Sequence, residues 1–161
     1  YVLGIMLDNV LAQANVMLER VLDSNYWLYK DNEAAGNTKA GLDINVINRS
    51  VDSSGAKYSV KMLSGGEKFV MSVILGLAIA SSVRNRNGGI EVNSLFIDEG
   101  FGTLDDDALK EILEVLAVFG SGKKIGIISH VSSLSSLPTG FEITRVVGGG
   151  SIVKTRASDG K

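Results

Sequence analysis

Two adjacent carboxylates near the middle of the chain are the residues best suited to chemistry. The apolar stretch 94–97 is rich in strand formers and leads directly into Asp98 and Glu99. Because side chains alternate along a strand, the two acids point in different directions at its end. One can then hold a divalent cation while the other faces an attacking water, as phosphoryl transfer requires. A strand that simply runs into an acidic turn explains the same pair, so the pair alone does not decide its role.

A glycine turn, which we define as Ser64, Gly65, Gly66 and Glu67, precedes a long apolar segment. Ser64 as N-cap and Glu67 three residues later predict a capping box, in which each side chain accepts a hydrogen bond from the other residue's backbone N–H. The box does not require two adjacent glycines, which weaken a helix. Glycines at a helix N-terminus let backbone N–H groups approach an anion. Capping and phosphate contact therefore both stay open, and they can coexist.

Asp105 and His130 are two further candidates. Asp105 opens a run of three aspartates before a predicted helix, where acids complement the helix dipole, and it also closes the tight turn 102–104. His130 is the single histidine of the chain and ends the apolar strand 125–129. A lone histidine is more often structural, but parallel strands bring their C-terminal ends to one crevice. His130 is therefore a candidate phosphate sensor.

The elements that must position these residues follow from hydrophobic periodicity. We predict an α/β fold whose second half is a parallel sheet with crossover helices, accompanied by antiparallel strands. The first 24 residues form an amphipathic helix that fits either packing on its own domain or the end of a coiled coil. The predicted helices cover residues 1–24, 66–84 and 108–119, the strands 26–29, 42–47, 57–62, 94–97, 124–128, 141–147 and 151–154, and the loops or breaks 32–38, 50–55 and 84–91.

Composition narrows the classes of function. The 161 residues suffice for one domain with a core, and the net charge of −2 gives no global signature of nucleic-acid binding. The chain has no cysteine, which excludes disulfides and thiolate metal sites.

The apolar segment 69–83 is shorter than a bilayer span of roughly 20 residues, and no secretion signal is evident, so we expect a cytoplasmic protein that does not enter a membrane. The chain begins with Tyr1, which suggests a fragment, and it lacks the G-x-x-x-x-G-K-[ST] phosphate loop.

Taken together, the motifs resemble the C-terminal half of an ATP-binding-cassette ATPase. Residues 63–67 are similar to the signature motif, 95–99 to the Walker B strand with its catalytic glutamate, 102–105 to the D-loop, and His130 to the switch histidine. Within that superfamily the segment from residue 62 to 138 resembles the SbcC family of DNA-repair ATPases, which are SMC-like. The N-terminal helix is similar to the returning strand of that family's long coiled coil.

The resemblance implies a site completed by other segments. The Walker A motif and the glutamine loop would lie in an N-terminal lobe of the same protein, beyond the coiled coil. Asp98 would support Mg²⁺, Glu99 would polarise the water, and His130 would contact the γ-phosphate of ATP.

The same resemblance implies contacts between two copies of the head. The glycine turn would close over ATP that is held by the opposite head of an ATP-dependent dimer. Asp105 would cross that interface and couple the two sites. Nucleotide would thus hold the dimer together, and hydrolysis would release it.

The implied function is that of the C-terminal ATPase lobe of an SbcC-like repair protein, with residues 1–24 as the root of the coiled coil and 25–161 as the lobe. ATP binding and hydrolysis at the head dimer would be coupled to processing of DNA ends by an SbcD-like nuclease. The isolated chain is expected to bind ATP weakly and to hydrolyse none. One alternative is a DNA-clamping ATPase of the SMC or RecN type, against which the turn 99–102 argues. Another is a non-catalytic interaction module, against which the intact Asp98, Glu99 and His130 argue.

Overall fold

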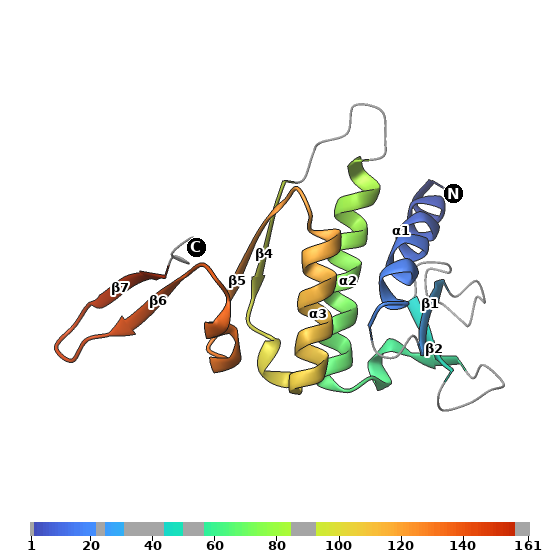
Figure 1. Cartoon of the computed structure of the whole chain (residues 1–161). Coiled ribbons are helices and arrows are strands. Elements are labelled where there is room, and N and C mark those ends of the chain that lie inside the picture. The colour runs from blue at the N-terminus through green and yellow to red at the C-terminus, as the bar shows by residue number, and fades with distance from the viewer. Residues whose placement is uncertain (1, 22–24, 31–43, 50–56, 85–92, 157–161) are drawn as a thin grey trace.

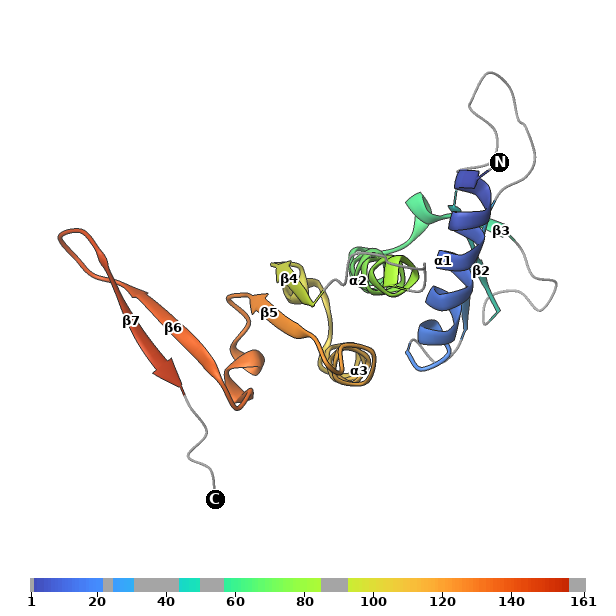
Figure 2. The same ribbon diagram turned by 90° about the horizontal axis from the view of Figure 1, so that it is seen from above.

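The computed structural model describes residues 2–21, 25–30, 44–49, 57–84 and 93–156. The elements of these residues lie in a row, from a small antiparallel sheet past the α-helices and a parallel strand pair to a protruding hairpin (Figures 1 and 2). The order of helices and strands confirms the predicted α/β class. The loops predicted at 32–38 and 50–55, and nearly all of the break at 84–91, lie outside the described residues.

Helix α1 (Val2–Leu18) leads into the antiparallel sheet of β1 (Tyr26–Lys30), β2 (Ile44–Asn48) and β3 (Lys57–Ser59). The strand order is β1-β2-β3, with Leu28 opposite Val46 at the buried centre. The aromatic and β-branched content of these strands suits a pleated, half-buried surface.

Two predicted boundaries in this region were wrong. Helix α1 ends at Leu18 and not near residue 24, since turns follow it as far as Val21. The strand predicted to reach residue 62 stops at Ser59, whose hydroxyl accepts a hydrogen bond from the N–H of Lys61 and begins a 3₁₀ turn at Val60–Met62. A side chain that bonds to nearby backbone in this way competes with the strand ladder.

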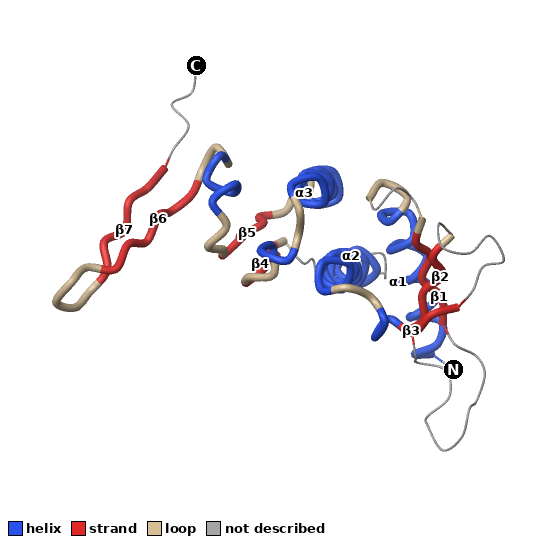
Figure 3. The backbone as a smooth tube through the Cα atoms, turned by 90° about the horizontal axis from the view of Figure 1, so that it is seen from below, coloured by secondary structure: helices blue, strands red, loops and turns tan. Residues whose placement is uncertain are grey.

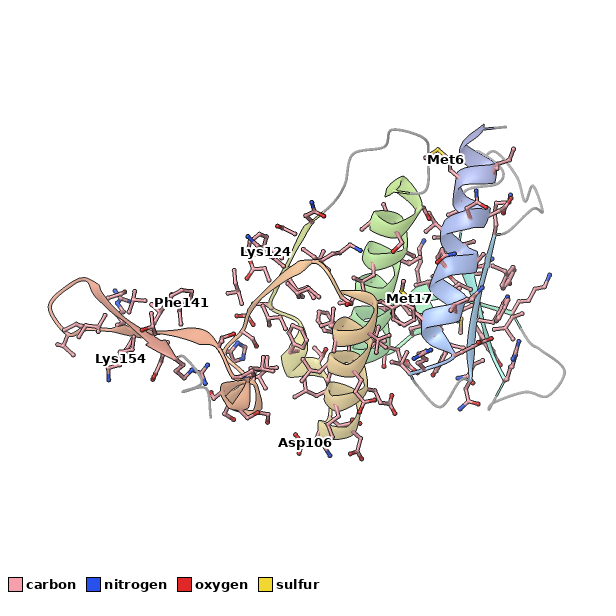
Figure 4. The ribbon with its side chains drawn as sticks, turned by 45° about the horizontal axis from the view of Figure 1, so that its top comes forward. Met6, Met17, Asp106, Lys124, Phe141 and Lys154 are labelled. Carbon is pink, nitrogen blue, oxygen red and sulfur yellow. The ribbon has the colours of Figure 1, made fainter. Side chains whose placement is uncertain are left out.

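Helix α2 (Gly65–Arg84) is the central helix of the chain. It packs against α1, which in turn lies between α2 and the three-stranded sheet (Figures 2 and 3). Met17, labelled in Figure 4, lies between the two helices and is fully buried. The α1 helix thus packs on its own domain, with the side chains of Leu11, Ala14, Met17 and Leu18 buried in the core.

The length argument against a membrane span was wrong for α2. The helix begins earlier than the apolar segment 69–83, and its residues Gly65–Ser82 are long and apolar enough, by length and composition, to cross a bilayer. Core helices of globular proteins pass the same test. Here Val70, Met71, Ile74, Leu77 and Ala78 are buried inside the chain, so the apolar character of α2 is explained by its core position.

The second half contains the predicted parallel strands. Strand β4 (Ser94–Asp98) pairs in parallel with β5 (Lys124–Ile128), and the crossover between them is helix α3 (Asp106–Phe119). The two strands are paired along their full length, from Ser94 opposite Lys124 to Asp98 opposite Ile128. The buried stripe of α3 comprises Leu109, Ile112, Val115 and Leu116.

Strands β6 (Gly140–Arg145) and β7 (Ser151–Arg156) form an antiparallel hairpin that extends away from the other elements (Figures 1 and 2). Almost every residue of both strands is exposed. A short 3₁₀ helix, η4 (Ser132–Ser136), connects β5 to this hairpin and buries Leu134. The hairpin is therefore attached to the core mainly at its base.

Candidate functional site

The first group of candidate residues lies at the C-terminal edge of the parallel strands. Asp98 is the last residue of β4 and is exposed, while Ile97 before it is buried, as the alternation of strand side chains requires. The backbone N–H of Glu99 donates to the carbonyl of Ile128 over 2.8 Å and continues the pairing by one residue. Glu99 then leaves the strand with φ +61°, a left-handed conformation that costs about 1–2 kcal/mol for a residue with a Cβ.

His130 and Glu99 meet, as predicted for the ends of neighbouring parallel strands. His130 Nδ1 lies 2.9 Å from Glu99 Oε2, and the two side chains are 80% and 52% exposed. A Cβ placed on Gly102 would lie 3.8 Å from His130 Nε2, so the turn after Glu99 passes close beside the imidazole. We call Asp98, Glu99 and His130 the carboxylate cluster. It is open to solvent and accessible to a ligand.

Packing from α2 holds the turn that follows Glu99. Gly100 has φ +97°, and a Cβ there would overlap the ring of Phe69 from α2. Phe69 also packs edge-on against the buried Phe101, with ring centroids 4.8 Å apart. Only glycine satisfies both the backbone angle and the close approach of the ring. The packing of Phe69 from α2 therefore holds the left-handed backbone conformation of Glu99 and Gly100 in place.

The glycine turn forms the predicted capping box at the N-terminus of α2. The backbone N–H of Glu67 donates to Ser64 Oγ over 3.2 Å, and that of Ser64 donates to Glu67 Oε2 over 2.6 Å. The other carboxylate oxygen, Glu67 Oε1, accepts a hydrogen bond from the hydroxyl of Tyr26 in β1. Both oxygens of Glu67 are therefore engaged within the chain.

These contacts shift the acidities of Tyr26 and Glu67. Burial and the neighbouring Glu67 carboxylate raise the pKa of Tyr26 to about 12. Burial alone would raise the pKa of Glu67, but the hydrogen bonds from Tyr26 and Ser64 outweigh it, and the pKa of Glu67 lies below its usual value. The pair therefore favours a neutral tyrosine donating to an ionised glutamate.

The two glycines have a packing role that the sequence did not reveal. A Cβ on Gly66 would lie 2.9 Å from the carbonyl oxygen of Thr103, and one on Gly65 would contact the Thr103 side chain. The glycine turn therefore rests against the turn that follows Glu99. Asp105, at the end of that second turn, is the N-cap of α3 and accepts a hydrogen bond from the N–H of Ala108 over 2.8 Å.

The structure thus gathers the predicted site residues into two groups joined by one turn. The carboxylate cluster lies at the end of β4 and β5, the glycine turn lies at the start of α2, and residues 100–105 contact both. Within the described part of the chain, no group of three or more acidic or histidine side chains is arranged to hold a metal by itself.

Comparison with known proteins identifies the class of fold and then the family. The chain has the fold of the C-terminal portion of an SMC head: it superposes on the Smc head domain with a coiled coil from Pyrococcus yayanosii with a TM-score of 0.69 at 15% identity, covering 95% of this chain and 28% of that one. A second SMC structure, from work on ATP-driven dimerisation and DNA-stimulated activation of SMC ATPases, gives a TM-score of 0.69 at 13% identity over 94% and 86% of the two chains. The profile of the SbcC/RAD50-like, Walker B motif family matches residues 36–118, just over half of the chain. The chain belongs to this family.

Curated relatives agree with the family. The SbcC protein of the SbcCD nuclease from Staphylococcus aureus strain Newman is 40% identical over 145 residues, which cover 89% of this chain and 14% of the relative. The chain thus spans about one seventh of the length of that relative.

Two residues that hold the site in place, Tyr26 and Phe69, are not indicated by the sequence. The sequence places Tyr26 only in a predicted strand, and Phe69 only in a predicted helix within the segment that resembles SbcC. Both act across long sequence separations, 41 residues in the case of Tyr26 and Glu67, for which a single sequence carries no signal. For Phe69, the glycine at position 100 was the nearest available hint, because a glycine next to a strand end often marks a close approach of another group.

Proposed function

We propose that this chain is the C-terminal ATPase lobe of an SbcC-like protein and supplies the metal and water chemistry for an ATP that another segment holds. The observation that carries the proposal is the carboxylate cluster: Glu99 and His130, 2.9 Å apart, stand beside Asp98 at the edge of a parallel strand pair. In α/β sheets ligands bind at that edge.

Each residue of the cluster has a role that suits its position. Asp98 would hold Mg²⁺ together with water and phosphate oxygens, and the ion would offset the negative charge that develops during phosphoryl transfer. Glu99 would orient the attacking water and accept its proton. With both ring nitrogens protonated, His130 would donate from Nδ1 to Glu99 and from Nε2 to the terminal phosphate.

The cradle for the β- and γ-phosphates would come from an N-terminal lobe of the same protein, because this chain has no phosphate-loop motif. A surface suited to that lobe is available. Phe96 and Ile128 lie on the face of β4 and β5 opposite to that of the buried Ile97 and are 74% and 56% exposed, and we call this pair the outer face. Exposed aromatic and aliphatic side chains next to a site commonly mark a protein interface.

The glycine turn would act on the ATP of a second head. Ser64 and Gly65 are exposed at the N-terminus of α2, where free N–H groups and the helix dipole favour a phosphate. Glu67, with both oxygens engaged by Ser64 and Tyr26, would hold the turn in shape while Ser64 and the glycines approach the phosphate. Asp105 would cross the interface between the two heads.

The biological setting follows from the relatives. SbcC proteins are named as part of a nuclease, so we infer an SbcD-like nuclease partner, DNA as the substrate of the complex, and a cytoplasmic location. Helix α1, within the segment 1–24, would form the root of a coiled coil, and residues 25–161 would form the lobe itself. The identity of 40% to SbcC against 13–15% to SMC heads favours the nuclease-associated class over the DNA-clamping class.

Replacement of Glu99 by glutamine in the full-length protein tests the proposal. The amide keeps the shape of the side chain but cannot accept a proton, so ATP hydrolysis should fall by about 10²- to 10⁴-fold while ATP still drives head dimerisation. Glu114→Gln, an exposed glutamate on α3, is the matched control and should hydrolyse at the native rate. Native turnover by the Glu99→Gln variant would remove Glu99 from the role of base.

A further inference from the structure

We propose that Tyr26 is a positioning residue for the glycine turn, and that strand β1 links this turn to helix α1. The inference rests on the proposed function, since it concerns how the turn that closes over the opposite ATP is held. It assigns to β1 the role of a rigid connection between the N-terminal helix and the nucleotide interface.

Alternate residues of β1 share one face, and they contact two different helices. Leu28 is held to α1 by Asn15: Asn15 Nδ2 donates to the carbonyl of Leu28 over 2.9 Å, and the N–H of Leu28 donates to Asn15 Oδ1 over 2.8 Å. Lys30 pairs with Asp8 of α1 over 2.8 Å. Tyr26 lies on the same face by the period of two and reaches Glu67 at the start of α2.

Asn15 is what makes the connection rigid. Its side chain is 3% exposed, and it is paired on both its donor and its acceptor side with one residue of β1. Burying an amide is unfavourable unless it is hydrogen-bonded, so the position of β1 relative to α1 is strongly specified. A shift of α1 would therefore move Tyr26 with it.

Tyr26 completes the connection at the glycine turn. Its hydroxyl donates to the same carboxylate that accepts the N–H of Ser64, so one side chain, Glu67, joins β1 to the first residue of the turn. A hydrogen bond to a charged group contributes more than one between neutral groups. Loss of the Tyr26 hydroxyl should leave the Glu67 carboxylate held only by the N–H of Ser64, and the turn less ordered.

The test uses the full-length protein in the Glu99→Gln background and measures ATP-driven dimerisation by sedimentation over a range of ATP concentrations. Tyr26→Phe should raise the ATP concentration for half-maximal dimerisation by about tenfold, the effect of one charged hydrogen bond. Tyr58→Phe, a tyrosine of the same sheet that also packs against the core, is the matched control and should not change it. A purely structural role for Tyr26 would lower the melting temperature without moving the ATP dependence, and that result would overturn the inference.

A parallel variant separates this inference from the proposed function. Ser64→Arg should abolish ATP-driven dimerisation because it places bulk and charge at the turn. If Ser64→Arg has no effect, the proposed trans contact fails. If Ser64→Arg abolishes dimerisation but Tyr26→Phe behaves like Tyr58→Phe, only the role of Tyr26 is overturned.

The link to α1 has its own variant. Asn15→Ala should raise the half-maximal ATP concentration in the same direction as Tyr26→Phe, and an unchanged value would contradict the link. Should Asn15→Ala fail to fold, Lys30→Met replaces it, because this change removes only the ion pair to the exposed Asp8. It too should raise the half-maximal ATP concentration, by about twofold, the effect of an ion pair with one exposed partner, and an unchanged value would again contradict the link.

Discussion

The two ends of the molecule differ in how their apolar side chains are covered. Around α1, α2 and the three-stranded sheet, side chains such as Met17, Leu28 and Val46 are fully buried, and the buried Asn15 is fully paired. In β4 and the hairpin, large apolar residues face solvent: Phe96 on the outer face, and Phe141 on the hairpin, which is 72% exposed. The first region also exposes Ile5, Val16, Met62 and Ile79, but it contains most of the buried core, whereas β6 and β7 contribute no side chain to that core.

The hairpin makes the contrast clearest. Phe141, Ile143 and Val153 lie on one side, while Glu142 and Lys154 lie opposite each other on the other side; Figure 4 shows Phe141 and Lys154 pointing in opposite directions. We call the apolar side the hairpin face. A two-stranded hairpin is at best marginally stable alone in water. An amphipathic hairpin with an uncovered apolar side therefore indicates that another segment covers it, and the proposed N-terminal lobe is the segment that also explains the exposed outer face.

The largest expected effect concerns this uncovered surface. Changing Phe96 and Phe141 together to serine should weaken binding of a separately produced N-terminal segment by about 100-fold or more, since each buried phenylalanine contributes about 1.5–3 kcal/mol. The chain's own stability should hardly change, because both rings are already exposed. Titration calorimetry measures the binding.

The control for this experiment is the pair Ile79→Ser and Val118→Ser, two half-exposed residues on the helices. Their combined change should leave the affinity for the N-terminal segment as it is. Equal losses of affinity in both double variants would show that the outer and hairpin faces do not bind the N-terminal segment. The proposed difference between the two regions would then be wrong.

Two glycines offer a second comparison between packed and open regions. Gly100 and Gly148 both have positive φ, at +97° and +106°, but a Cβ on Gly100 would overlap Phe69 whereas Gly148 has open space around it. Gly148→Ala should cost about 1–2 kcal/mol of unfolding free energy from backbone strain. Gly100→Ala should cost about 1–3 kcal/mol more because the ring of Phe69 must also move. Thermal unfolding measures the loss of stability in both variants. Equal losses would mean that the ring of Phe69 moves aside at no cost in free energy.

The smallest expected effect is a pH dependence at the glycine turn. The pKa of Glu67 is lowered on folding, so its contribution to stability is complete above the ordinary value of 4.5 and is lost as pH falls through the folded pKa. The melting temperature of the chain should therefore exceed that of Glu67→Gln at neutral pH, and the difference should shrink below about pH 4.5. A difference that stays constant down to about pH 3 would show that the ionised carboxylate adds nothing at this turn.

Local patterns were sufficient to predict most elements and the approach of His130 to Glu99. Strand β4 is a short apolar run bounded by polar residues, and the parallel pairing followed from the alternation of strands and helices. The capping box was also predicted correctly, because Ser64 and Glu67 are only three residues apart. The capping box depends on neighbours in sequence, whereas the approach of His130 to Glu99, 31 residues apart, followed from the general rule that parallel strands end at one edge.

Most of what escaped prediction depends on contacts between distant residues, but two boundaries depend on local turns. The end of α1 and the end of β3 were set by turns whose hydrogen bonds compete with regular structure. The approach of Gly66 to Thr103, of Phe69 to Gly100 and of Tyr26 to Glu67 joins separate elements. From the sequence, Gly65 and Gly66 were interpreted as a phosphate contact or as part of a helix start. The structure shows in addition that they pack closely against the turn that contains Thr103.

The most direct measurement of the central claim is ATP hydrolysis by this chain alone and after addition of the N-terminal segment of its full-length protein. A composite site predicts no turnover by the chain alone and restored turnover once the N-terminal segment is bound, with no restoration in Glu99→Gln. Robust hydrolysis by the purified chain without that segment would contradict the account.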